Sequence, residues 1–261
     1  MPHLFTAWGE VEARIRAARK VFLLLDYDGT LTPIVARPEL ALCPPEAKSL
    51  LEKLRNCPGS QVAIISGRAL EDLKGKVGVS GIIYVGNHGL EMENPAGIHR
   101  KNLSPRRREE LGRVRKELEA GLSSFAGVSF EDKGPTLTVH YRNAPRGSEG
   151  PVQAAVERVL AGYPDRWRIS TGKKIVEIHP RIEFDKGKTV RELLDRSPGA
   201  RLLPVYLGDD RSDEEAFLAV REGGISVFVG PEPESSAASF FLRDPSEVLE
   251  FLRRCEQALR S

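Results

Sequence analysis

Long apolar runs, paired cysteines and a strong charge of either sign are all missing from this 261-residue chain. No stretch approaches the roughly 20 consecutive apolar residues of a membrane-spanning helix, and residues 1–20 lack the apolar centre of a signal peptide. Cys43, Cys57 and Cys255 are scattered, which favours a reducing compartment over a disulfide framework or a zinc site. We therefore expect a cytoplasmic protein that does not bind membranes.

The charge balance is also weak, since the formal net charge is only +2. A balance this close to neutral argues against nucleic acid as the main partner. The basic run 106–108 is followed at once by two glutamates, which is typical of a solvated helix face. There is no internal repeat or low-complexity tract, and the length suits one large domain or a core with an insert. We expect a free-standing monomer that acts on a small molecule.

Short apolar runs alternate with helical patterns in residues 1–104 and again in 183–261. Strands are predicted at 21–26, 61–65, 82–85, 203–207 and 225–229, and most of them end in small polar residues. Helices are predicted between them, with starts near Pro45 and Asp185 and a last helix after Asp244. This alternation is typical of a parallel sheet whose site lies at the carboxyl ends of the strands.

The middle of the chain, residues 105–182, has a different pattern. A helix is predicted from Ser104-Pro105, strands at 128–132 and 136–142, a helix over 152–160, and strands at 167–171 and 174–179. The order helix–strand–strand, repeated once, predicts a small antiparallel α+β layer. We expect residues 105–182 to form a cap inserted into an α/β core made of 1–104 and 183–261.

The stretch 21–33 carries the strongest chemical signal. Its buried strand ends at Asp26, and Asp28 follows two residues later, so both carboxylates point the same way if the extended geometry continues. Two carboxylates at the end of a buried strand repel each other and are costly to desolvate, unless a divalent cation binds them. An aspartate pair that only caps a turn is the alternative, and it does not explain the Asp-x-Asp-Gly-Thr order.

Phosphoryl transfer needs a nucleophile, a metal, donors for the phosphate oxygens and an acid for the leaving group. Asp26 is the candidate nucleophile and Asp28 the candidate acid and base. The Asp28 backbone carbonyl, Asp26 and Asp209 can offer oxygen ligands to Mg²⁺. Ser66 offers a hydroxyl to phosphate, and Lys186 offers a positive charge that offsets the carboxylates.

Seven motifs carry a resemblance to a known family; they occupy residues 25–34, 65–68, 86–91, 140–142, 172–180, 185–188 and 208–214. The chain resembles the haloacid-dehalogenase-type phosphatases and, among them, the trehalose-6-phosphate phosphatases. The resemblance implies a Rossmann-like core with an inserted α+β cap, and a Mg²⁺-dependent phosphoric monoester hydrolase that acts through an aspartyl-phosphate. Ser212 and His179 depart from the family, which more often has Thr and Arg there.

The resemblance also implies roles for individual residues. It assigns catalytic roles to Asp26, Asp28 and Lys186, and it makes Asp26, Asp28 and Asp209 the expected metal ligands. It places Asp210, Asp213 and Gly29 in support. It assigns substrate contacts to Thr30, Ser66, Arg68, His88, Arg142, Lys173 and Glu177.

Several of these assignments have alternatives. Arg142, Lys173 and Glu177 could instead form a solvent-facing strand with an ion pair across it. Arg68 could be a surface residue at a helix start, His88 a turn residue, and Asp210 a helix cap. The roles of Glu131 and His140 stay open, with Glu131 a further candidate for the sugar.

The sequence also leaves other functions open as alternatives to a trehalose-6-phosphate phosphatase. These are a phosphatase for sucrose phosphate or glucosylglycerate phosphate, a phosphomutase, and a sensor that binds sugar phosphate without turnover.

Overall fold

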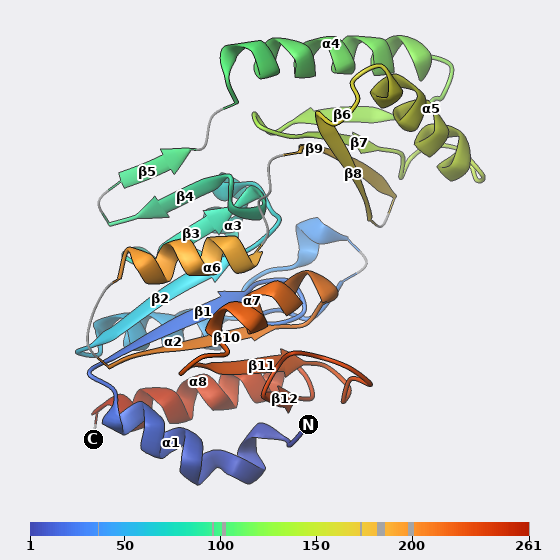
Figure 1. The fold of residues 1–261 in the computed structure, drawn as a ribbon. Helices are drawn as coiled ribbons and strands as arrows, with labels where there is room; N and C mark the ends of the chain where they lie inside the picture. The colour runs from blue at the N-terminus through green and yellow to red at the C-terminus, as the bar shows by residue number, and fades with distance from the viewer. Residues whose placement is uncertain are drawn as a thin grey trace. The chain divides into compact units, whose positions relative to one another are not determined.

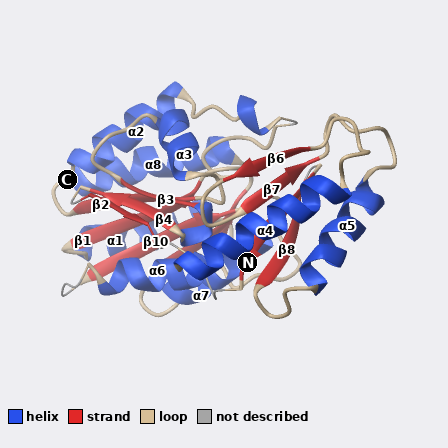
Figure 2. Cartoon of the chain, turned by 90° about the horizontal axis from the view of Figure 1, so that it is seen from above, coloured by secondary structure: helices blue, strands red, loops and turns tan. Residues whose placement is uncertain are grey.

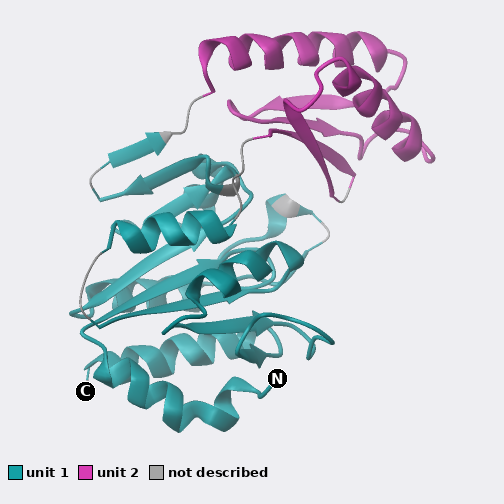
Figure 3. Cartoon of the chain, in the orientation of Figure 1, with its two compact units in different colours: residues 1–99, 184–261 teal, residues 100–183 magenta. Residues whose placement is uncertain are grey.

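The computed structural model describes residues 1–35, 37–95, 97–100, 103–172, 174–181, 186–197 and 201–260. The chain divides into two compact units, which we call the core unit and the insert unit (Figure 3). The core unit comprises residues 1–99 and 184–261, and the insert unit comprises residues 100–183. Each unit has its own sheet and its own apolar core.

The core unit is built on an eight-stranded sheet in the order β12-β11-β10-β1-β2-β3-β4-β5. The strands are β1 (Lys20–Asp26), β2 (Ser60–Ile65), β3 (Ile83–Gly86), β4 (Glu91–Asn94), β5 (Gly97–Arg100), β10 (Leu202–Gly208), β11 (Ile225–Val229) and β12 (Phe240–Leu242). From β12 to β3 all neighbouring strands pair in parallel, and β4 pairs with β3 in the antiparallel sense. Strand β1 therefore lies inside the sheet, between β10 and β2 (Figure 1).

Helices cover both faces of this sheet. They are α1 (Trp8–Ala17), α2 (Pro45–Asn56), α3 (Leu70–Val77), α6 (Lys186–Asp195), α7 (Glu214–Val220) and α8 (Pro245–Arg260). Short 3₁₀ turns occur at Leu4–Ala7, Pro38–Leu40, Asn87–Gly89 and Arg211–Asp213. Figure 2 shows α2 and α3 on one side of the sheet and α6 and α7 on the other.

The alternation of side chains along β1 explains why both faces are covered. Leu23 and Leu25 belong to the apolar cluster that includes α1, α2, α3 and α8. Phe22 and Leu24 belong to the cluster that includes Val190 of α6 and residues of α7. Because strand residues alternate between faces, a strand buried on both sides must be apolar throughout, as the run 21–25 is. By the same alternation, Asp26 follows Phe22 and Leu24 and faces the layer of α6 and α7.

The insert unit has a four-stranded antiparallel sheet in the order β6-β7-β9-β8. Its strands are β6 (Ser129–Asp132), β7 (Leu137–His140), β8 (Trp167–Gly172) and β9 (Ile175–Pro180). Helices α4 (Pro105–Gly121) and α5 (Glu149–Ala161) pack on one face against Val139, Val176 and Ile178. The Ser104 side chain caps α4 by accepting a hydrogen bond from the Arg107 backbone N–H.

The expected fold class is confirmed: an α/β core with a largely parallel sheet, and an α+β layer with an antiparallel sheet. Strands β4, β5 and β12 were not expected, since all three are short and the first two are mostly polar. The expected strand 136–142 was wrong at its end, because β7 stops at His140. Tyr141 starts a turn, in which its carbonyl accepts from the Ala144 N–H. Within the described ranges, no helix combines the length and apolar character that crossing a membrane would need.

Candidate active site

Asp26 lies at the carboxyl end of β1, and a lysine from another element holds it there. Its side chain is almost fully buried. Lys186, the first residue of α6, donates from Nζ to Asp26 Oδ1 at 2.6 Å. Burial alone would lower the pKa of Lys186, but the charges of Asp26 and Asp213 offset this and raise it above its ordinary value. The lysine is therefore a fixed cation beside the candidate nucleophile.

Asp213 completes this bridge from the other side. Its Oδ1 accepts from Lys186 Nζ at 2.7 Å and from Tyr206 Oη at 2.6 Å, and its Oδ2 accepts from the Asp210 N–H at 3.0 Å. The residue is fully buried. A Cβ at Gly208 would lie 2.3 Å from Asp213 Cγ, so only glycine leaves room for this side chain at the end of β10. Asp213 thus orients Lys186 as well as adding charge.

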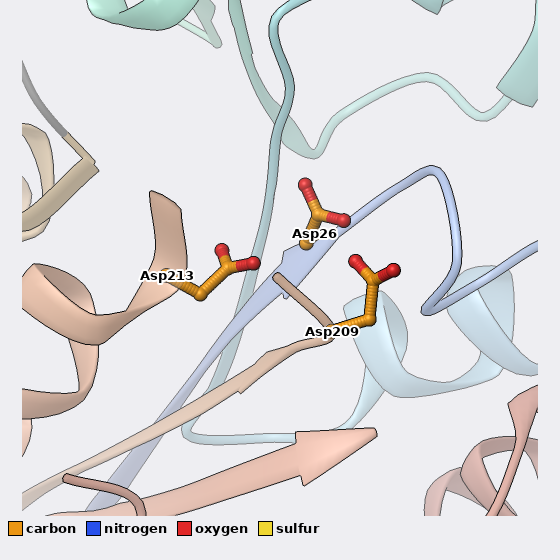
Figure 4. A group of neighbouring side chains, drawn as sticks. All are labelled: Asp26, Asp209 and Asp213. Atoms are coloured by element: carbon orange, nitrogen blue, oxygen red, sulfur yellow. The ribbon is translucent and has the colours of Figure 1, made fainter. Parts of the chain in front are cut away.

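Three carboxylates come together around the lysine. Oxygens of Asp26, Asp209 and Asp213 all lie within 4.8 Å of one another, at the ends of β1 and β10 and in the turn before α7 (Figure 4). Burial, with help from Asp213 and Asp209, raises the pKa of Asp26 well above its ordinary value despite the opposing charge of Lys186. Burial and the Asp213 charge likewise raise the pKa of Asp209 to about 6. One ammonium does not balance three carboxylates, so the cluster favours a further cation.

The backbone at Gly29 allows Asp209 to approach β1. Gly29 has φ +89°, and a Cβ there would lie 1.9 Å from Asp209 Oδ2. Any other residue would be strained at this φ and would also collide with the carboxylate. The carboxylate oxygens of Asp209 therefore lie close to the peptide bond between residues 28 and 29. Carboxylate and backbone carbonyl oxygens are ligands that suit a hard divalent cation such as Mg²⁺. The residues present therefore fit the expected metal.

Asp28 does not share the surroundings of Asp26. β1 ends at Asp26 and the chain turns at Gly29, so the condition for the two carboxylates to point the same way, extended geometry through Asp28, is not met. Both oxygens of Asp28 instead accept from Arg68, at 2.7 Å from Nε and 2.6 Å from Nη2. Arg68 also donates from Nη1 to Asp72 at 2.9 Å. Its guanidinium is thus engaged with carboxylates of the core unit.

The two hydroxyls expected at phosphate differ in their surroundings. Ser66 follows β2 directly, is nearly buried, and its Oγ accepts from the Arg68 N–H at 3.2 Å. Thr30 is fully buried, and its hydroxyl has no hydrogen-bond partner among the described residues. Phosphate contacts by either hydroxyl stay predictions.

The side chains of two expected substrate residues lie outside the described part of the chain. Lys173 is not described, and of His88 only the backbone is, in the turn Asn87–Gly89. Asp210 is exposed and accepts from the Arg211 N–H, as a helix cap does. This geometry agrees with the structural alternative for Asp210.

In the insert unit, a polar row crosses the sheet face opposite the helices. It follows the register Glu131, Thr138, Glu177 and Ser170. Glu177 is mostly buried and accepts from Lys133 Nζ at 2.6 Å and Thr138 Oγ1 at 3.1 Å.

Two other candidates of the insert unit, Glu131 and Arg142, differ in their positions. Glu131 pairs with His140 at 2.9 Å. Arg142 belongs to the turn after β7, not to the strand. The structure therefore does not place Arg142 on the strand face that carries Glu177.

Among the described residues, the partners of the site that sequence reasoning missed include Lys133, Asp72 and Tyr206. Lys133 falls between the predicted strands 128–132 and 136–142, and Tyr206 falls within the predicted apolar strand 203–207. Their contacts join positions that no local pattern connects. Asp72 had one available signal, since it stands four residues after Arg68, at the spacing of a helical ion pair.

The fold and this geometry define a class. A buried aspartate ends an inner parallel strand, a lysine joins it to a carboxylate of a later element, and an α+β unit is inserted between the two parts of the core. This is the haloacid-dehalogenase-type fold.

The chain belongs to the trehalose-phosphatase family, whose model matches residues 24–246. It is 39% identical over 245 residues to the trehalose-phosphate phosphatase of Mycobacterium ulcerans. The matched region covers 91% of this chain and 62% of that protein. The chain thus spans less than two thirds of the length of this relative. The expected family resemblance is confirmed.

The solved structures that share the fold include two from Candida albicans. The C-terminal domain of the Candida albicans trehalose-6-phosphate phosphatase superposes with a TM-score of 0.79 at 24% identity, covering 98% of each chain. The C-terminal domain of the Candida albicans trehalose synthase regulatory protein gives a TM-score of 0.70 at 13% identity, covering 97% of this chain and 98% of that one. Both likenesses concern the fold alone, so the residues of the site must decide between catalysis and regulation.

Proposed function

We propose that this chain hydrolyses trehalose 6-phosphate to trehalose and phosphate, with Mg²⁺ as cofactor and a phosphorylated Asp26 as the intermediate. The observation that carries the proposal is the buried bridge from Lys186 to Asp26 and Asp213, at 2.6 and 2.7 Å. Membership of the trehalose-phosphatase family supports the choice of substrate. Both half-reactions use residues of the core unit.

In the first half-reaction, an Asp26 carboxylate oxygen attacks phosphorus and the bond from phosphorus to the sugar oxygen breaks. Asp28, in its carboxylic acid form, gives its proton to the leaving oxygen. In the second, Asp28 takes a proton from a water molecule as the water oxygen attacks phosphorus, and Asp26 leaves as a carboxylate. Each cycle consumes one water and restores both aspartates.

We assign Mg²⁺ to Asp26, Asp209 and the backbone carbonyl of Asp28. When bound, the ion supplies positive charge that neutralises phosphate oxygens and carboxylates. Lys186 keeps the Asp26 carboxylate in place, and Asp213 keeps Lys186 in place. Ser66 is assigned to a phosphate oxygen.

We assign the choice of sugar to the polar row of the insert unit. Glu177 and Lys133 are charged groups fixed against each other at 2.6 Å, and such groups can exchange hydrogen bonds with sugar hydroxyls. Arg142 and Lys173 remain candidate sugar contacts. We also propose the cytoplasm as the compartment, and no nucleic acid or membrane as partner.

A sensor without turnover is the second candidate, because a protein described as regulatory shares this fold. A binding module does not need a nucleophile beside a buried lysine, and this chain keeps Asp26, Asp28, Lys186 and Asp209. Phosphatases for other sugar phosphates would use the same core residues, and a phosphomutase would return the phosphate to sugar.

The test is a phosphate-release panel over trehalose 6-phosphate, sucrose 6-phosphate and glucosylglycerate phosphate, each with Mg²⁺ and with a chelator. We expect kcat/KM for trehalose 6-phosphate to exceed the others by at least about 10-fold, which corresponds to about 1.4 kcal/mol. A smaller preference would contradict the substrate, and no release from any ester would favour the sensor. Isomerised sugar phosphate among the products would favour the phosphomutase.

A further inference from the structure

One ion pair of the core unit joins the proposed acid and base to a residue expected at the sugar. Arg68 binds Asp28 through two parallel N–H···O bonds, at 2.7 and 2.6 Å, and the ring of Tyr27 lies 5.4 Å from the guanidinium carbon. The third nitrogen of the guanidinium donates to Asp72 at 2.9 Å. Paired bonds between a guanidinium and a carboxylate fix the orientation of both planes as well as their distance.

The backbone of Arg68 is itself held from several sides. Its N–H donates to Ser66 Oγ at 3.2 Å, and its carbonyl accepts from the Asn87 N–H at 2.6 Å. Gly86 permits this approach, since a Cβ there would lie 2.6 Å from the Leu70 nitrogen and 2.9 Å from the Arg68 carbonyl oxygen. The arginine side chain therefore extends from a fixed point between the ends of β2 and β3.

Asp28 depends on such a partner. Its side chain is 42% exposed, whereas that of Arg68 is only 11% exposed. Packing therefore restricts the carboxylate little, and hydrogen bonds decide its orientation. A general acid must lie within hydrogen-bond reach of the atom that receives its proton, so the orientation of this carboxylate decides whether it can work.

Given the proposed function, on which this inference rests, we propose that Arg68 is the positioning residue for Asp28 and not a sugar contact. The paired hydrogen bonds hold the carboxylate, and one of them is exchanged for the leaving oxygen when substrate binds. The other keeps the carboxyl group aimed at that oxygen. In the acid form of Asp28, its carbonyl oxygen accepts the remaining bond from Arg68, and its O–H faces the leaving oxygen. The proton on Asp28 is the one taken from water in the preceding turnover, so Arg68 keeps all its protons.

The experiment compares Arg68→Gln and Arg68→Lys with the parent chain on three esters, namely trehalose 6-phosphate, ethyl phosphate and p-nitrophenyl phosphate. The quantity compared is kcat/KM, because it reports the steps through phosphorylation of the enzyme and omits its hydrolysis, which is common to all three. Ethyl phosphate needs a proton on its leaving oxygen but has no sugar. The p-nitrophenolate leaving group needs no acid.

A positioning role predicts that Arg68→Gln lowers kcat/KM about 10- to 100-fold for both trehalose 6-phosphate and ethyl phosphate, within the range of general acid catalysis. p-Nitrophenyl phosphate should change less than about 3-fold, because no proton transfer is lost. Arg68→Lys should recover part of the loss, since it restores the charge and one of the two bonds. Asp72→Asn is the matched control, which removes the other partner of Arg68 and should change all three esters less than about 3-fold.

A loss confined to trehalose 6-phosphate would assign Arg68 to the sugar and overturn the proposal. An equal loss for all three esters, or no loss, would also overturn it. In the background of Asp28→Asn, Arg68→Gln should add less than about 2-fold to the loss on trehalose 6-phosphate, because the two residues act as a unit. A full additional loss there would contradict the coupling. Failure of the proposed function is distinct, since the parent chain would then release no phosphate.

Discussion

The carboxylate cluster predicts that Asp209→Asn stabilises the metal-free protein while removing its response to Mg²⁺. Burial first, and the Asp213 charge second, raise the pKa of Asp209 from 3.8 to about 6, whereas Lys186 lowers it. Between these two values the folded chain holds a proton that the unfolded chain has lost. Stability contributed by this group is therefore lost as pH rises from about 4 to about 6. Above about pH 6, the ionised Asp209 carboxylate lowers the free energy of unfolding by its full amount.

The size of the effect follows from the same shift. One pKa unit is worth about 1.36 kcal/mol, so a rise from 3.8 to about 6 corresponds to about 3 kcal/mol. Asp209 is only partly buried, and solvent screening reduces this to about 1–2 kcal/mol. At about 2–4 °C per kcal/mol, the metal-free Asp209→Asn variant should melt about 2–8 °C higher at pH 7.5.

The assay is calorimetry at pH 7.5 and pH 4, with a chelator and with Mg²⁺ at about 100 times its Kd. Saturation at that level should stabilise the parent chain by about 2.7 kcal/mol and the variant hardly at all, which reverses their order. At pH 4 the metal-free difference should shrink. The matched control is Asp210→Asn, which alters an exposed neighbour that caps a turn and should change little, because Asn and Asp cap equally well.

Two results would refute this reasoning. One is a metal-free Asp209→Asn protein that is no more stable than the parent at pH 7.5. The other is an equal Mg²⁺ response in both chains, which would place the ion away from Asp209.

Three further predictions concern activity. Asp26→Asn should abolish turnover with the fold intact, and more than trace activity in a clean preparation would exclude Asp26 as nucleophile. Gly29→Ala should abolish activity, because its Cβ would meet Asp209. The control Gly223→Ala has a similar φ of +79° and nothing within 4 Å of its Cβ, so it should cost only about 1–2 kcal/mol of strain and keep activity. Equal activities of the two variants in steady-state assays would contradict this. Glu177→Gln should raise KM at least about 5-fold for trehalose 6-phosphate and less than about 2-fold for p-nitrophenyl phosphate, and equal shifts in both would remove Glu177 from the sugar site.

The inner strands could be predicted from the sequence because burial on both faces demands uninterrupted apolar residues. The predicted strand 21–26 matches β1 (Lys20–Asp26) to within one residue, and 203–207 lies within β10 (Leu202–Gly208). β4 could not be predicted in the same way. Its residues Glu91–Asn94 are mostly polar, and it is held by pairing with β3 rather than by an apolar pattern of its own.

The candidate site was predictable in its residue types but not in its pairings. Strand alternation could be applied as far as Asp26 and no further, because β1 ends there. The partner of Asp28 comes from a loop 40 residues later, and the partner of Glu177 from a turn 44 residues earlier. Such contacts depend on how the sheets assemble, which no local pattern records.

The central claim is that phosphate passes from trehalose 6-phosphate to Asp26 before it reaches water. The most direct measurement mixes the Mg²⁺-loaded chain with ³²P-labelled trehalose 6-phosphate, quenches with acid within one turnover, and maps the labelled peptide. Transfer through Asp26 predicts label on the peptide that contains Asp26, loss of that label as free phosphate forms, and no label in Asp26→Asn. Release of labelled phosphate with no labelled peptide, or label on another residue, would contradict it.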